Sequence, residues 1–280
     1  PTIINNVETL ANIPAVIHNG AKWFSRIGTE KSKGTKVFSL GGNIKNAGLV
    51  EVPMGTTLRE VIYEIGGGIP KNKALKAVQT GGPSGGAIPE SLLDLPIEYE
   101  TLVAAGSMMG SGGMVVIDED NCMVDICRFY LEFTVEESCG KCTPCREGTK
   151  KMLEILNIIS SGEGTLEDLA FLEKLAGSVK NSSLCGLGQA APNPILSMLE
   201  HFRDEFEAHV VDKKCPGGVC KPLINLHVLE NCIGCTKCAK NCPVDCISGS
   251  LKQMHKIDNS VCIKCGICKI VCPVDAIVSI

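Results

Sequence analysis

The sequence predicts an α+β chain built from several small units. Residues 35–79 alternate short apolar strands with one helix, and residues 146–211 hold three amphipathic helical patterns. A cysteine-rich segment then occurs twice between residues 232 and 277. A length of 280 residues suits one large domain or two to three small ones, and the change of pattern along the chain favours the second.

Composition and charge exclude several classes of function. The net charge is −4, aromatic residues make up 4 % and Trp23 is the single tryptophan, which argues against a nucleic-acid partner. No apolar run approaches the roughly 18 residues of a membrane span, and no signal peptide opens the chain, so we expect a cytoplasmic protein without a membrane span. In that reducing compartment seventeen cysteines indicate metal ligands, not disulfides.

The duplicated segment predicts two iron–sulfur clusters. Residues 232–247 are CIGCTKCAKNCPVDCI and residues 262–277 are CIKCGICKIVCPVDAI, so each copy has the C-x2-C-x2-C-x3-C-P spacing of bacterial ferredoxins with two [4Fe–4S] clusters. In such pairs the fourth cysteine of each copy binds the other cluster. One ligand set is therefore Cys232, Cys235, Cys238 and Cys272, and the other is Cys262, Cys265, Cys268 and Cys242. Zinc held by C-x2-C pairs is the alternative, which the duplicated order disfavours.

A second C-x2-C-x2-C motif, Cys139, Cys142 and Cys145, has no fourth cysteine nearby. The next cysteine is Cys185, and two helical patterns lie between, over about 146–160 and from a Thr165-x-x-Asp168 capping box onward. An antiparallel helix pair would bring Cys185 back to the three-cysteine loop. Four thiolates there suit either a [4Fe–4S] cluster or a zinc ion.

Five cysteines remain. Cys122 and Cys127 lie in an apolar stretch and are most simply buried thiols. Cys215, Cys220 and Cys246 form a structural zinc site if one histidine completes the set, and His255 is favoured because it follows the first copy of the repeat. The alternative is three thiols without a ligand.

The strand and helix signals of the first half predict a small β-grasp-like unit. Apolar strands are expected over 35–42, 49–53 and 74–79, with a helix over 57–65. The glycine-rich segments 81–86 and 106–113 match neither phosphate-loop pattern, so we interpret them as tight turns. A further amphipathic helix is expected over 192–211.

Four motifs, in chain order, carry a family resemblance: PTIINNVETLANIP at 1–14, VPMGTTLRE at 52–60, ESCGKCTPCREGT at 137–149 and SLCGLGQAAPNP at 183–194. They resemble the flavoprotein that oxidises NADH in respiratory complex I and its relatives. The GGPSGG segment and the appended ferredoxin repeat look closest to the β subunit of multimeric, NAD-dependent, electron-bifurcating [FeFe] hydrogenases. The subunits of NAD-dependent formate dehydrogenases are similar.

The resemblance also divides the chain. It implies that 1–34 is the tail end of an FMN- and NADH-binding domain, 35–105 is a β-grasp domain of the SLBB type, and 106–211 is a helical [4Fe–4S]-binding bundle. A linker with the zinc site would follow over 212–231, and a ferredoxin-like domain over 232–280.

By similarity Asn5, Asn6 and Thr9 contact FMN, although N-N-x-E-T is otherwise an ordinary helix start. The glycine-rich loop that holds the flavin phosphate in this family is missing from the sequence. We therefore expect the flavin half in a longer subunit or on another polypeptide. The resemblance assigns Cys139, Cys142, Cys145 and Cys185 to the [4Fe–4S] cluster beside the flavin, in place of zinc.

The implied activity is electron transfer between NADH-reduced FMN and three [4Fe–4S] clusters, in an NADH-dependent oxidoreductase subunit that is inactive alone. The implied partners are a hydrogenase or formate dehydrogenase catalytic subunit, a small [2Fe–2S] thioredoxin-like subunit and ferredoxin. No side chain is expected to act as an acid–base catalyst, since hydride chemistry belongs to the cofactor. The competing hypothesis is a non-enzymatic, polyferredoxin-like electron-transfer adaptor.

Overall fold

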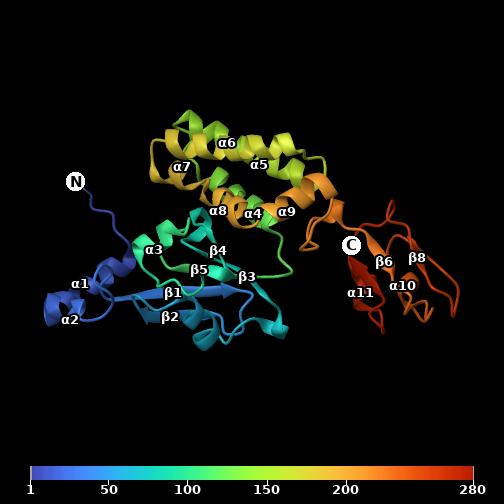
Figure 1. Ribbon diagram of the computed structural model, residues 1–280, viewed down its shortest axis with the longest axis horizontal. Coiled ribbons are helices and arrows are strands. Elements are labelled where there is room, and N and C mark those ends of the chain that lie inside the picture. Colours follow the sequence, from blue (N-terminus) through green and yellow to red (C-terminus); the bar gives the residue numbers. More distant parts are fainter. Residues whose placement is uncertain (1, 280) are drawn as a thin grey trace.

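Alternating apolar residues build a five-stranded sheet in the computed structural model, which describes residues 2–279 (Figure 1). Its strands are β1 (Thr35–Gly42), β2 (Gly48–Pro53), β3 (Leu75–Thr80), β4 (Ala87–Pro89) and β5 (Gly113–Asp118). In β1 the side chains of Phe38 and Leu40 are buried and the intervening Ser39 is exposed, as the period of a strand requires. The three predicted strands are confirmed to within one residue at each end.

The strand order is β2-β1-β5-β3-β4, with β1 and β5 parallel and all other pairs antiparallel. The sheet therefore takes in residues 113–118, which lie beyond residue 105, where the sequence analysis ended this unit. The physical reason is that β5 fills the centre of the sheet and pairs with β1 on one side and β3 on the other. The expected helix over 57–65 is helical, with wide π-type turns at Glu60–Ile65, and α3 (Tyr99–Ala104) follows β4.

Above the sheet in Figure 1 lies a helical bundle. Its members are α4 (Met123–Glu137), α5 (Thr143–Ser161), α6 (Leu166–Ser182), α7 (Gly186–Ala190), α8 (Asn193–His201) and α9 (Arg203–Glu207). The capping box of Thr165 and Asp168 is present at the start of α6. Gly148 of α5 lets α6 approach closely, because a Cβ at Gly148 would lie 2.3 Å from a methyl carbon of Val179.

The helix expected over 192–211 is broken at Phe202. This residue leaves helical geometry (φ −136°, ψ 32°), so α8 ends there and α9 begins in a new direction, followed by a π-type turn at Ala208–Asp212. The break turns Glu205 and His209 toward the junction of the sheet and the bundle, where both side chains are buried.

The two ends of the chain form smaller units on either side of the sheet (Figure 1). At the start are α1 (Val7–Asn19) and α2 (Ala21–Ser25), in which no residue is fully buried. At the other end are β6 (Leu226–Val228), α10 (Lys237–Lys240), β7 (Ile247–Ser248), β8 (Lys256–Ile257), α11 (Ile267–Ile270) and β9 (Ile277–Ser279). β6 pairs with β9 and β7 with β8, so the two copies of the repeat form one module with two antiparallel ladders. Across the described residues, no helix is both long enough and apolar enough to cross a bilayer.

Candidate metal centres

The three cysteines of the 138–148 loop lie where α5 begins. Cys142 directly precedes α5 and Cys145 lies in its first turn, while Cys185 directly precedes α7. The backbone N–H of Leu184, and then that of Cys145, hydrogen-bonds the Cys142 thiol and lowers its pKa. The antiparallel pair α5–α6 thus returns residues 184 and 185 to the three-cysteine loop, as the topology argument expected.

Small residues and a hydroxyl hold Cys145 in place. Ser138 Oγ lies 3.3 Å from Cys145 Sγ, and a Cβ on the buried Gly188 would lie 3.0 Å from the Cβ of Cys145. Cys145 is buried, whereas Cys139 and Cys185 are exposed. A cluster bound by these thiols would therefore lie at the surface of the bundle, within reach of a neighbouring redox group.

The ferredoxin-like module contains two small cavities, and each is lined by cysteines from both copies of the repeat. Cavity A is lined by Cys232, Cys235, Cys238 and Cys272. Cavity B is lined by Cys262, Cys265, Cys268 and Cys242. The structure thus brings together the two crossed sets that the spacing predicts.

The walls of both cavities suit a buried cluster. The remaining side chains are largely valine, isoleucine and leucine, and backbone N–H groups point at sulfur. Ala276 N donates to Cys272 Sγ at 3.2 Å in cavity A, and Lys264 N donates to Cys262 Sγ at 3.4 Å in cavity B. Four thiols, N–H donors to sulfur and an apolar wall fit a [4Fe–4S] cluster in each cavity.

Cys246 and His255 lie in this module and not beside Cys215 and Cys220, so the expected zinc set is not brought together. Cys246 lines cavity B, with its Sγ 3.4 Å from Cys242 Sγ, and His255 lines cavity A. Pairing of β7 with β8 keeps both residues inside the module. Residues 213–220 instead pack back against the bundle.

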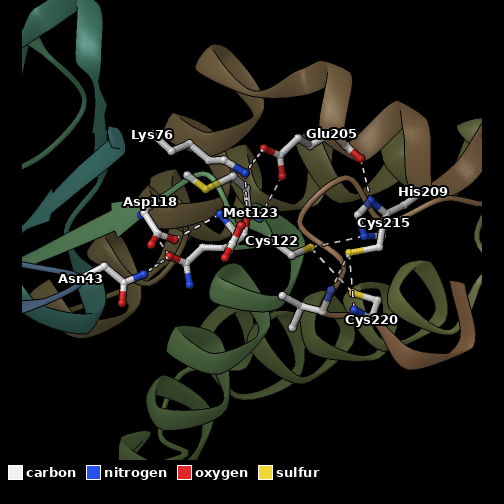
Figure 2. Close-up of polar contacts among 12 residues, drawn as sticks. Asn43, Lys76, Asp118, Cys122, Met123, Glu205, His209, Cys215 and Cys220 are labelled. Carbon is white, nitrogen blue, oxygen red and sulfur yellow. Dashed lines mark hydrogen bonds and ion pairs between the residues drawn. The ribbon is translucent and has the colours of Figure 1, made fainter. Parts of the chain in front are cut away.

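Cys215 and Cys220 meet Cys122 and His209 there, and these four residues form a Cys3His group (Figure 2). Their ligand atoms all lie within 4.8 Å of one another, with Cys122 Sγ 3.3 Å from His209 Nε2 and 3.7 Å from Cys220 Sγ. Cys122 is thus more than the plain core thiol that we expected. No local spacing signals it, because it lies far upstream of the other three. Cys127 does match the expectation, since it is fully buried against Met198.

The Cys3His group has the supporting contacts of a metal site. His209 Nδ1 donates to the carbonyl oxygen of Glu205 at 2.6 Å, which directs Nε2 toward the thiols. The backbone N–H groups of Val219 and Cys220 donate to Cys215 Sγ at 3.3 and 3.4 Å. The Glu205 carboxylate in turn accepts from Lys76 Nζ at 2.6 Å and from Met123 N at 3.1 Å, which ties the site to β3 and α4 (Figure 2).

Shared protons perturb the pKa values within this group. Hydrogen bonds, first with Cys122 and then with Cys220, lower the pKa of Cys215, whereas hydrogen bonding with Cys215 raises the pKa of Cys122. Burial lowers the pKa of His209, but hydrogen bonds with Cys122 and Cys215 outweigh it and raise the value to about 10. One thiolate therefore forms readily beside the protonated imidazole, and a divalent cation would replace the remaining protons on binding.

At the start of the chain, Asn6 and Thr9 line a pocket between α1 and β1, together with Glu8 and Lys36. Asn6 Oδ1 accepts from Glu8 N at 3.0 Å and so begins α1. Asn5 lies outside the lining of this pocket, and its side chain accepts from Asn6 N at 2.8 Å.

Comparison with known proteins agrees with this layout. Three family descriptions match the chain in order: the SLBB domain over 37–87, the NADH-ubiquinone oxidoreductase-F iron-sulfur binding region over 125–209, and the 4Fe-4S dicluster domain over 228–280. The chain is also 60 % identical, over 256 residues, to the NADP-reducing hydrogenase subunit HndC of Solidesulfovibrio fructosivorans. It is 45 % identical, over 216 residues, to an NADH-quinone oxidoreductase subunit of Rhizobium meliloti (strain 1021).

The chain is thus similar to these oxidoreductase subunits along most of its length. The match to HndC covers 91 % of this chain and 52 % of that protein, and the match to the Rhizobium meliloti protein covers 77 % and 51 %. The chain therefore spans about half the length of the curated relatives it matches. Its fold matches a chain of the NAD+-reducing [NiFe]-hydrogenase in the air-oxidized state, with a TM-score of 0.68 and 34 % identity over 75 % of this chain and 36 % of that one. The resemblance drawn from the four motifs and the α+β multidomain fold are confirmed.

Proposed function

We propose that this chain is the electron-transfer part of an NADH:acceptor oxidoreductase subunit in a multi-subunit hydrogenase. The observation that carries the proposal is the pair of cavities in the ferredoxin-like module, each lined by four cysteines from both copies of the repeat. The C-x2-C-x2-C motif of the bundle supports a third cluster. Relatives named as hydrogenase and NADH-quinone oxidoreductase subunits support the reaction class.

Each set would hold one [4Fe–4S] cluster. The ligands are Cys139, Cys142, Cys145 and Cys185 in the bundle, with the four cysteines of cavity A and the four of cavity B in the module. When bound, such clusters accept and release single electrons with little rearrangement. The chain itself would exclude water from cavities A and B and direct backbone N–H groups at sulfur. The bundle cluster would stay accessible at the surface, because Cys139 and Cys185 are exposed.

The Cys3His group is the second metal centre of the proposal, where we assign a structural zinc ion in place of the set expected from sequence. Three thiols, one correctly oriented imidazole and N–H donors to sulfur match closed zinc sites. Because Cys122 precedes α4 and Cys215 and Cys220 belong to the linker, such an ion would fasten the linker to the bundle.

The flavin contact belongs to the same proposal. Asn6 and Thr9 line the pocket beside β1, and this supports a role for the 5–9 segment at the edge of an FMN site completed by another segment or polypeptide. Seventeen free cysteines support a cytoplasmic location. The proposed partners are a hydrogenase catalytic subunit, a small [2Fe–2S] thioredoxin-like subunit and ferredoxin, with electron bifurcation as the mode of use.

One preparation tests these points together. The native complex is purified anaerobically, its subunits are identified, and iron, acid-labile sulfide, zinc and flavin are counted against this chain. A hydrogenase catalytic subunit, flavin and NADH:dye reductase activity support the proposal. A formate dehydrogenase catalytic subunit would replace the partner only. Iron and sulfide without flavin or NADH:dye reductase activity would favour the adaptor hypothesis, and iron without zinc would remove the zinc assignment.

A further inference from the structure

Cavity A contains a histidine that neither the cluster ligands nor the Cys3His group uses. His255 lines the cavity beside Cys232, Cys235, Cys238 and Cys272, in a wall that is otherwise apolar among the residues described. The residue is 1 % exposed, and its Nε2 is buried without a hydrogen-bond partner in the described part of the chain. A buried polar atom normally has a partner, so this one points to a group that would fill the cavity.

The orientation of the ring is fixed by its neighbours. His255 Nδ1 lies 3.1 Å from the carbonyl oxygen of Gln253, so Nε2 is the ring nitrogen left without a contact in the described part of the chain. Gly249 packs against the ring, because a Cβ there would lie 2.6 Å from the Cγ of His255. Any larger residue at 249 would displace the imidazole.

The segment that carries His255 is also bound to the first cysteine loop. Lys252 N donates to the carbonyl oxygen of Gly234 at 3.0 Å, and a Cβ on Gly234 would lie 2.3 Å from Gln253 N. Gly234 lies between Cys232 and Cys235. The histidine and the cysteines of cavity A are therefore held as one unit.

Cavity B shows which residue occupies the position equivalent to His255 in the other half of the module. Ile247 and Ile277 occupy the same position in the two copies of the repeat. Val228 of β6 pairs with Ile277, and Ile257 of β8 pairs with Ile247. Val228 thus corresponds to Ile257, and two residues earlier Leu226 corresponds to His255. Leu226 lines cavity B, so the two cavities differ at this position by a leucine and a histidine.

We propose that His255 Nε2–H donates a hydrogen bond to a sulfur of the cluster in cavity A and so raises its reduction potential above that of the cluster in cavity B. The inference rests on the proposed function, which places a [4Fe–4S] cluster in each cavity. A donor to sulfur stabilises the reduced form more than the oxidised form, because reduction adds negative charge to the cluster.

The test compares the wild-type complex with complexes carrying His255→Leu, which copies the wall of cavity B. Potentiometric EPR should show the equilibrium constant for reduction of one module cluster falling about tenfold, which is about 59 mV for a one-electron couple, while the other stays unchanged. His255→Gln, which keeps an N–H donor, should restore part of the shift. His227→Leu is the matched control, because His227 lies one residue from Leu226 on β6 and is exposed, and it should change neither cluster.

A measurement on the wild-type complex needs no folded variant. With 15N-labelled histidine, ENDOR of the reduced cluster in cavity A should show a weak 15N coupling that is absent from the cluster in cavity B. Absence of the weak 15N coupling, a strong coupling that marks a nitrogen–iron bond, or an unchanged potential in His255→Leu would each overturn the inference. Failure of the wild-type module to hold two clusters would instead overturn the proposed function.

Discussion

Replacing Glu205 with alanine should loosen the start of α4 and the floor of the Cys3His group. The Glu205 carboxylate accepts from Lys76 Nζ at 2.6 Å and from Met123 N at 3.1 Å, and the two charged side chains are only 9 % and 13 % exposed. Among the described residues, the substitution leaves the Lys76 ammonium with one partner, the carbonyl oxygen of Asn121, and it leaves the Met123 amide without its acceptor.

Removing one member of a buried ion pair costs about 3–5 kcal/mol, and we expect the lower end here because Lys76 keeps that carbonyl. A loss of about 3 kcal/mol increases local opening by roughly 100-fold, since each 1.4 kcal/mol is a factor of ten. Amide hydrogen exchange across the first turn of α4 measures this opening directly.

Two further variants test whether the lost protection comes from the unpaired buried charge. Lys76→Met combined with Glu205→Leu removes both charges and should recover most of the lost protection, because a matched apolar pair avoids the unpaired ion. Arg203→Ala breaks the exposed pair with Glu173, in which the side chains are 43 % and 46 % exposed, and should change exchange only slightly. A Glu205→Ala variant that exchanges within about threefold of the wild type, or a double variant no better protected than it, would refute the account.

Three further predictions concern the metal centres. Cys122→Ala should abolish zinc binding and leave the iron content unchanged, whereas Cys246→Ala should leave zinc in place. Metal analysis of both variants measures this. Loss of zinc in Cys246→Ala alone would contradict the Cys3His group. Cys242→Ala should remove the cluster in cavity B, whose other three ligands belong to the second copy of the repeat, although Cys242 lies in the first copy. EPR that shows loss of the cluster in cavity A instead would contradict the crossed ligand sets. Gly188→Ala should disturb the bundle cluster alone, because the added methyl would lie 2.6 Å from the side chain of Ser183 and 3.0 Å from the Cβ of Cys145. An unchanged EPR signal from that cluster would contradict this prediction.

What the sequence predicted well depended on neighbouring residues. The strand over 35–42 follows from its apolar alternation, and the start of α6 from the capping box at Thr165. The crossed cysteine sets follow from the spacing within each copy of the repeat, and the return of Cys185 from two helices of similar length. In each of these cases the periodicity or spacing of nearby residues already contains the geometry.

The errors came from contacts between distant segments. Cys122 joins Cys215 only because the linker folds back onto the start of α4, and nothing near Cys122 in the sequence signals this. His255 was drawn into the zinc set by its closeness to Cys246 along the chain, although pairing of β8 with β7 directs it into cavity A. β5 was assigned to the bundle because its pairing with β1 and β3 spans more than thirty residues of intervening chain.

We propose that electrons from NADH enter through the bundle cluster and reach the module. The most direct test is anaerobic reduction of the intact complex by NADH, followed by freeze-quench EPR, in the wild type and in Cys142→Ala. The account predicts that NADH reduces clusters in both the bundle and the module of the wild type. In the variant, the two module clusters should be present and reducible by dithionite but no longer by NADH. Module clusters that NADH still reduces at the wild-type rate in Cys142→Ala would contradict it.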